Sequence, residues 1–81
     1  MRESEKLLLR PIRQACGLSI AELARITETS RNTVYALEGG RSVRRSTVIA
    51  MLQVMAAHDR FTAAKKDVRE ELRRLNVREP E

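Results

Sequence analysis

Two short stretches with helical spacing, separated only by a turn at 27–29, constrain this chain more than any other feature. The first begins at Ser19 and the second at Ser30, and serine is a preferred residue at the start of a helix. Helices this short cannot bury their apolar faces as a parallel or antiparallel pair. They have to cross steeply and rest on a third element, so the sequence predicts a crossed helix pair within 17–41.

The rest of the chain also has helical spacing, and no stretch alternates apolar and polar residues as a strand does. This predicts an all-α fold of five helices. Pro11 lies inside the first of them, so that helix either kinks there or begins near Arg10. The expected helices are Lys6–Cys16, one that begins at Ser19, Arg31–Glu38, one that Ser46 or Thr47 caps, and Thr62–Leu75.

Length and composition exclude several kinds of protein. With 81 residues, the chain has room for one hydrophobic core. Its two aromatic residues, Tyr35 and Phe61, are too few for a surface on which unpaired bases stack. One cysteine, Cys16, and one histidine, His58, exclude a closed zinc site, and we expect no metal and no cofactor. No pattern places a nucleophile near His58 and Asp59, so we expect no enzymatic activity.

The charge of the chain is positive and unevenly distributed. Lysine and arginine number 16 against 11 aspartates and glutamates, which gives a net charge of +5. Residues 1–45 contribute +4 of this charge, with nine basic and five acidic residues. A basic chain favours a polyanionic partner, and this distribution favours phosphate contacts in the first half of the chain.

No segment is typical of a targeting signal or a membrane span. The leucines at 7–9 form a run too short for the core of a signal peptide. The longest apolar stretch, Val48–Ala57, has about half the length that a bilayer requires and indicates a buried helix. We therefore expect a soluble, cytoplasmic protein with no membrane partner.

The crossed pair predicts helix-turn-helix geometry, in which the second helix enters the major groove of duplex DNA. An arginine can donate to O6 and N7 of guanine, and an asparagine can pair with N6 and N7 of adenine. Phosphate groups can be bound by hydroxyl groups near a helix N-terminus and by basic side chains that follow the helix. In a helix that begins at Ser30, the residues that point away from the core are Arg31, Asn32 and Tyr35, with Ala36 at the edge. The expected phosphate contacts are Ser19, Ser30, Thr33, Arg41, Arg44 and Arg45.

Each of these assignments has an alternative that involves no DNA. Arg31 could be a solvated helix residue, and Asn32 could serve only the start of its helix. The ring of Tyr35 could fold back over the core. The basic loop Arg41–Arg45 could simply be solvated.

An ordered string of residues resembles the Cro and lambda-repressor type of helix-turn-helix, also called the xenobiotic-response-element family. The resemblance covers about Leu9–Met55 and departs from the family pattern at three positions. Pro11 lies in the first helix, Ile20 replaces a common glutamine, and Glu28 replaces the usual glycine of the turn, where a left-handed conformation strains it. The matching residues are Leu9-Arg10, Ile12-Arg13, Gly17-Leu18-Ser19, Glu22-Leu23-Ala24, Ser30-Arg31-Asn32-Thr33-Val34, Leu37-Glu38, Gly40-Arg41, Thr47-Val48, Met51-Leu52 and Val54-Met55.

This resemblance implies a five-helix lambda-repressor-like domain whose helix 31–38 contacts bases. The base contacts that it implies are Arg31, Asn32, Tyr35 and Ala36, with Ala36 against a thymine methyl group. It divides the chain into a DNA-binding domain at 1–58, a C-terminal helix at 59–76 and a tail at 77–81. It also implies pairing of two copies on a near-palindromic operator, in a bacterial or phage-type protein associated with the nucleoid.

The C-terminal helix carries a thin apolar stripe that has two interpretations. Phe61, Val68 and Leu75 repeat every seven residues, the spacing of a seam between two helices. We expect these residues and Leu72 to form a homodimer interface. The alternative is that the stripe packs back onto the domain.

Together these features predict a sequence-specific regulator of transcription that binds double-stranded DNA and acts as a repressor or autoregulator. The alternative is an antitoxin or accessory subunit whose C-terminal helix binds a partner protein.

Overall fold

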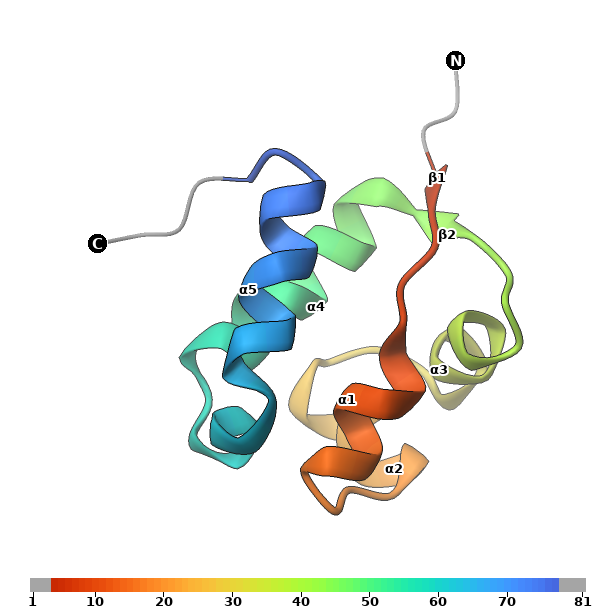
Figure 1. The fold of residues 1–81 in the computed structure, drawn as a ribbon. Helices are drawn as coiled ribbons and strands as arrows, with labels where there is room; N and C mark the ends of the chain where they lie inside the picture. Colours follow the sequence, from red (N-terminus) through yellow and green to blue (C-terminus); the bar gives the residue numbers. More distant parts are fainter. Residues whose placement is uncertain (1–3, 78–81) are drawn as a thin grey trace.

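A computed structural model describes residues 4–77, so most of the predicted tail, 78–81, lies outside the described residues. Within 4–77 the chain forms five α-helices, one 3-10 helix (η1) and two very short strands (Figure 1). The elements are β1 Ser4–Glu5, α1 Leu9–Ala15, α2 Ile20–Ile26, α3 Arg31–Glu38, β2 Val43–Arg44, α4 Arg45–Ala57, η1 Asp59–Ala64 and α5 Lys65–Arg74. The all-α class is confirmed, and α3 has the predicted bounds.

The first helix begins at Leu9, close to the predicted alternative start near Arg10 and later than the alternative at Lys6, and Pro11 does not break it. Because α1 starts at Leu9, Pro11 is its third residue. An N–H group in the first turn has no partner within the helix, so proline removes no bond there. At its other end, Gly17 adopts a left-handed φ of 65°, which ends the helix where the sequence predicted.

The two strands were not predicted from the sequence. Ser4 pairs with Arg44 and Glu5 with Val43 in an antiparallel ladder. Each strand has only two residues, which is too short for an alternation of apolar and polar residues to be recognised. Because β2 leads directly into α4, that helix begins at Arg45 without a side-chain cap, and the predicted caps at Ser46 and Thr47 are wrong.

The core extends through the whole described chain. Figure 1 shows α4 and α5 side by side, with α1, α2 and α3 grouped beside them. Val48, Met51 and Leu52 of α4 are fully buried, as expected of its apolar stretch. One apolar cluster joins these residues to α1, α2, α3 and α5, so residues 59–76 share the core of the first 58 residues.

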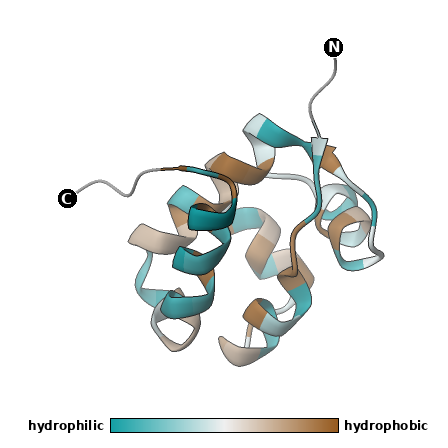
Figure 2. Ribbon diagram, turned by 45° about the horizontal axis from the view of Figure 1, so that its top comes forward, coloured by the Kyte–Doolittle hydropathy of each residue, from teal (hydrophilic) through white to brown (hydrophobic). Residues whose placement is uncertain are grey.

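The apolar stripe of the C-terminal segment belongs to this same core. Figure 2 shows α5 mostly in hydrophilic colours. Phe61, Val68, Leu72 and Leu75 are each at most 2% exposed within the single chain. This burial contradicts the prediction that these four side chains form a dimer interface. The segment also divides into η1 and α5 rather than forming one continuous helix.

No helix within residues 4–77 combines the length and the apolar character needed to cross a membrane.

Candidate nucleic-acid interface

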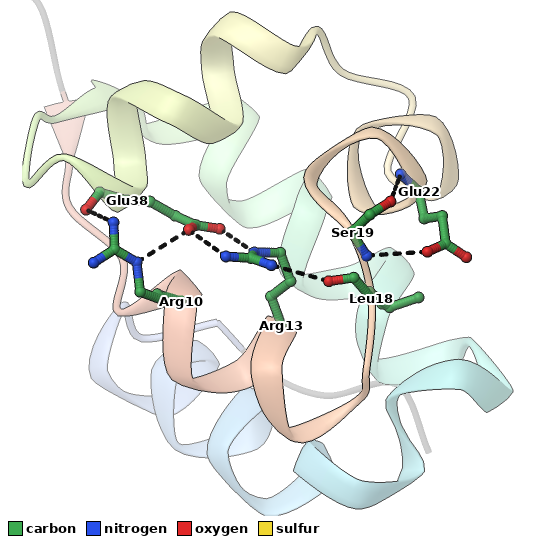
Figure 3. Close-up of polar contacts among 6 residues, drawn as sticks. All are labelled: Arg10, Arg13, Leu18, Ser19, Glu22 and Glu38. Atoms are coloured by element: carbon green, nitrogen blue, oxygen red, sulfur yellow. Dashed lines mark hydrogen bonds and ion pairs between the residues drawn. The ribbon is translucent and has the colours of Figure 1, made fainter.

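The crossed pair consists of α2 and α3, and α2 begins with a complete capping box. The Ser19 hydroxyl oxygen accepts a hydrogen bond from the backbone N–H of Glu22 at 3.1 Å. The Glu22 carboxylate accepts one from the backbone N–H of Ser19 at 3.0 Å (Figure 3). These bonds lower the pKa of Glu22. They satisfy donors that would otherwise be unpaired, so the predicted start of this helix is confirmed.

Glu28 occupies the turn between α2 and α3, at the position where the resemblance places glycine. Glu28 adopts a left-handed φ of 56°. Beside it, the buried Thr27 hydroxyl donates to the carbonyl of Leu23 at 2.8 Å and also bonds with the Thr29 hydroxyl at 2.9 Å. These bonds hold the turn in a conformation that costs a side chain about 1–2 kcal/mol.

Glu28→Gly is therefore expected to stabilise the protein by about 1 kcal/mol, because glycine removes the left-handed strain but gains entropy in the unfolded chain. The free energy of unfolding in urea measures this. Asn76→Gly is the matched control, since Asn76 has a similar φ of 60° and asparagine tolerates that conformation better. An equal gain at both positions, or a loss at Glu28, would contradict the explanation.

The start of α3 is capped by Ser30, whose hydroxyl oxygen accepts from the backbone N–H of Thr33 at 3.1 Å. The hydroxyl groups of Ser30 and Thr33 also bond to each other at 3.0 Å. Both lie at the surface, with Thr33 half-buried. The two predicted phosphate ligands are thus adjacent at the N-terminal end of the helix.

The predicted base-contacting residues share the outer face of α3. Val34 and Leu37 are buried against the core, whereas Arg31 and Asn32 are exposed and Ala36 is half-buried. Tyr35 is 57% exposed, so its ring does not fold back over the core. Asn32, Tyr35, Ala36 and Arg41 line one surface hollow of about 510 Å³ together with Gly39.

Three of the predicted arginines are exposed on or after this helix, and the fourth, Arg45, is engaged within the chain. Within residues 4–77, Arg31, Arg41 and Arg44 form no ion pair and no side-chain hydrogen bond. Arg45 instead donates to the carboxylate of Glu5 at 3.0 Å and to the carbonyl of Leu75. These contacts tie α4 to β1 and to the end of α5, and the Arg45 side chain is still 29% exposed, so its phosphate contact stays a prediction.

A buried ion pair holds the C-terminal end of α3 against α1. Glu38 has a side chain only 3% exposed, and its two carboxylate oxygens accept hydrogen bonds from Arg13 at 2.6 and 2.9 Å (Figure 3). Arg10 donates to the same carboxylate at 3.2 Å. The hydrogen bonds from Arg13 hold the pKa of Glu38 below its usual value, although burial acts in the opposite direction.

Arg13 also fixes the loop that leads into α2. Its guanidinium donates to the carbonyl of Leu18 at 3.0 Å, directly before the Ser19 cap. One side chain therefore connects α1, the start of α2 and the end of α3. Sequence reasoning missed this role: Arg13 and Glu38 belong to the matching string, but residues 25 apart give no local signal of pairing.

Sequence reasoning also missed Arg25, an exposed arginine of α2. Arg25 of α2 lines a hollow of about 390 Å³ with Thr29 and Arg31, between the two helices of the pair. Arg25 thus adds a positive charge beside Arg31, in a hollow that Glu22 also lines. Its position on the polar face of α2, the first helix of the crossed pair, is the sequence feature that could have indicated Arg25.

Comparison with known proteins identifies the family. No curated protein and no solved structure matches the chain in these comparisons. A family model described as helix-turn-helix domain matches residues 7–64, well over half of the 81 residues. The matched range contains α1 through η1, and with them the crossed pair and the basic segment after it. The chain therefore belongs to the helix-turn-helix domain family. A domain of this family indicates DNA binding and a role in the regulation of transcription.

Proposed function

We propose that this protein is a sequence-specific regulator that binds duplex DNA in the major groove with α3 and represses transcription by occupying promoter DNA. The observation that carries the proposal is the exposed face of Arg31, Asn32 and Tyr35 on a helix whose opposite face is buried. The Arg13–Glu38 pair supports it, because a helix that reads bases has to be held rigidly on the domain.

Arg31 and Asn32 carry sequence preference in this proposal. Both lie in the first turn of α3, the part of a recognition helix that reaches base edges. Arginine suits a guanine and asparagine an adenine, and Ala36 suits the methyl group of a thymine. A near-palindromic operator would let two copies use the same contacts on both half-sites.

The phosphate contacts in this proposal come from Ser19, Ser30, Thr33, Arg41 and Arg44. The hydroxyl groups lie at the starts of α2 and α3, and the two arginines follow α3. Contacts of this kind give affinity that depends on salt and fix the orientation of the protein without selecting a sequence.

Selection of bound sites from random duplex DNA, followed by measurement of Arg31→Ala on the selected site, tests the proposal. We expect Arg31→Ala to lose about 1–3 kcal/mol of discrimination at one base pair. Arg44→Ala should weaken all sequences equally and reduce the salt slope by about 1. Lys66→Ala is the charge control, because Lys66 is exposed on α5. If no sequence is enriched, or if Arg31→Ala and Asn32→Ala leave the preference unchanged, the proposal is wrong.

A further inference from the structure

The strand β1 pairs with the segment that carries Arg44, one of the proposed phosphate ligands. Ser4 lies opposite Arg44 and Glu5 opposite Val43, and Figure 1 shows β1 beside β2. Successive side chains of a strand point to opposite sides. Accordingly, Val43 is half-buried against the core and Arg44 is exposed. The pairing with β1 therefore fixes the backbone from which the Arg44 side chain extends into solvent.

A ladder of two residues a strand cannot hold itself in place. Even longer two-stranded ladders are at best marginally stable in water when they stand alone. Other contacts therefore have to keep β1 on β2. The carboxylate of Glu5 and the backbone carbonyl of Lys6 both take part in such contacts.

Glu5 joins β1 to two arginines from different helices. Its carboxylate accepts a hydrogen bond from Arg45 of α4 at 3.0 Å and forms an ion pair with Arg74 of α5 at 3.6 Å. Arg74 also donates to the carbonyl of Lys6 at 2.7 Å. The Glu5 side chain is only 26% exposed, so salt screens its ion pairs less than it screens those of exposed side chains. One carboxylate thus ties β1 to the start of α4 and to the end of α5.

The negative charge of Glu5 is unfavourable for DNA binding if charge is all that it contributes. Glu5 lies opposite Val43, next to the residue that we propose contacts a phosphate. A carboxylate at that place repels a phosphate backbone, so its removal would strengthen binding. A positioning role predicts the opposite sign, because removal would release β1. The sign of the change therefore distinguishes the two effects.

We infer that Glu5 is a positioning residue for DNA binding, which holds β1 against α4 and α5 so that β1 keeps Arg44 in place for a phosphate group. This role rests on the proposed function, which gives Arg44 a phosphate to contact. With β1 held, the backbone at 43–44 is ordered before DNA arrives. Without it, the ordering takes place on binding, and ordering one residue weakens binding about tenfold.

The order of Arg44 in the absence of DNA tests the first step of this role. Glu5→Gln keeps the size of the side chain and removes its charge. The NMR order parameter of the Arg44 backbone N–H should be about 0.85 in the wild type and below about 0.6 in Glu5→Gln. Glu70→Gln, the same change at an exposed position of α5, is the control and should leave it unchanged. An unchanged value in Glu5→Gln would show that burial of Leu7, 4% exposed, is enough to hold β1, and would overturn the inference.

The affinity for a selected duplex site tests the second step. Glu5→Gln should weaken binding about three- to tenfold, although it makes the chain more positive. Glu70→Gln makes the chain more positive by the same amount and should bind at least as tightly as the wild type. If Glu5→Gln binds as tightly as Glu70→Gln, Glu5 has no positioning role.

A double-mutant cycle with Arg44 separates positioning from a general loss of stability. In an Arg44→Ala chain the side chain to be positioned is absent, so Glu5→Gln should change the affinity by less than about twofold. An equal loss in both backgrounds would show that Glu5 acts on the whole fold, and would overturn the inference. Circular dichroism confirms that each variant is folded.

The same binding measurements distinguish this role from the proposed function. If the wild type binds no duplex, the proposed function is wrong and the role of Glu5 in DNA binding is wrong with it. If Arg31→Ala loses base preference but Arg44→Ala binds as tightly as the wild type, the function holds and the inference is wrong, because there is no contact to position.

Discussion

Phe61→Ala is expected to lower the free energy of unfolding by about 3–5 kcal/mol, because it leaves a large cavity in the centre of the core. Phe61 is 1% exposed and is among the largest fully buried side chains of the chain. Its ring meets that of His58 edge to face, with 6.0 Å between the ring centres. A loss of this size is a large fraction of the stability of any small domain. Urea denaturation followed by circular dichroism measures it.

The second aromatic residue of the chain is a matched control for this substitution. Tyr35→Ala removes a ring of similar size from a side chain that is 57% exposed. It should change the free energy of unfolding by only about 0.5 kcal/mol. The proposed function predicts the opposite ranking for DNA binding, where Tyr35→Ala acts on the contact surface and Phe61→Ala does not.

The Phe61 experiment also distinguishes the two interpretations of the C-terminal stripe. If the stripe were a dimer seam, Phe61→Ala would reduce the molecular mass in solution and leave the folding of each copy almost unchanged. If the stripe is part of the core of one chain, the variant unfolds at a lower urea concentration whether or not it is dimeric.

The sequence predicted most accurately those features that depend on neighbouring residues. The Ser19–Glu22 capping box and the bounds of α3 come from local hydrogen bonds and from the glycines after the helix, and both are confirmed. The exposed face of α3 follows from the positions of Val34 and Leu37, since a helical period of 3.6 residues determines which side chains point the other way.

Features that depend on distant residues could not be predicted in this way. A helical period shows that Phe61 and Leu72 share a face, but it does not show whether α4 or a second chain covers that face. Arg45 has the same local pattern as Arg44, and only the fold brings Glu5, 40 residues away, to its guanidinium.

Glu38→Gln is expected to destabilise the protein by about 2–3 kcal/mol at neutral pH. It removes a buried charge that accepts hydrogen bonds from two arginines, and losses of this kind reach about 3–5 kcal/mol when the remaining charge stays buried. The loss is smaller here because Arg13 and Arg10 have side chains that are 16% and 58% exposed, so water can solvate them. Arg13→Ala should accordingly cost more stability than Arg10→Ala.

The effect of Glu38→Gln should also depend on pH, with a sign set by the lowered pKa of Glu38. Hydrogen bonds from Arg13 keep this pKa below the ordinary value of 4.5, so the folded chain binds the proton less tightly than the unfolded chain. The stabilisation is therefore complete above about pH 4.5 and is lost as the pH falls through the folded pKa. Glutamine does not titrate, so the difference in stability between the wild type and the variant should shrink on acidification.

Urea denaturation of the wild type and of Glu38→Gln, from neutral pH down to about pH 3, measures this difference. The range includes the pH values at which the unfolded wild type binds the Glu38 proton and the folded wild type does not. Glu70→Gln makes the same chemical change at an exposed position of α5 and should alter the free energy of unfolding by only about 0.5 kcal/mol. If Glu38→Gln unfolds at the wild-type urea concentration at neutral pH, or if its deficit persists unchanged at acidic pH, the ion pair does not hold α3. In that case the packing of Val34 and Leu37 alone fixes α3, the helix that we propose contacts DNA.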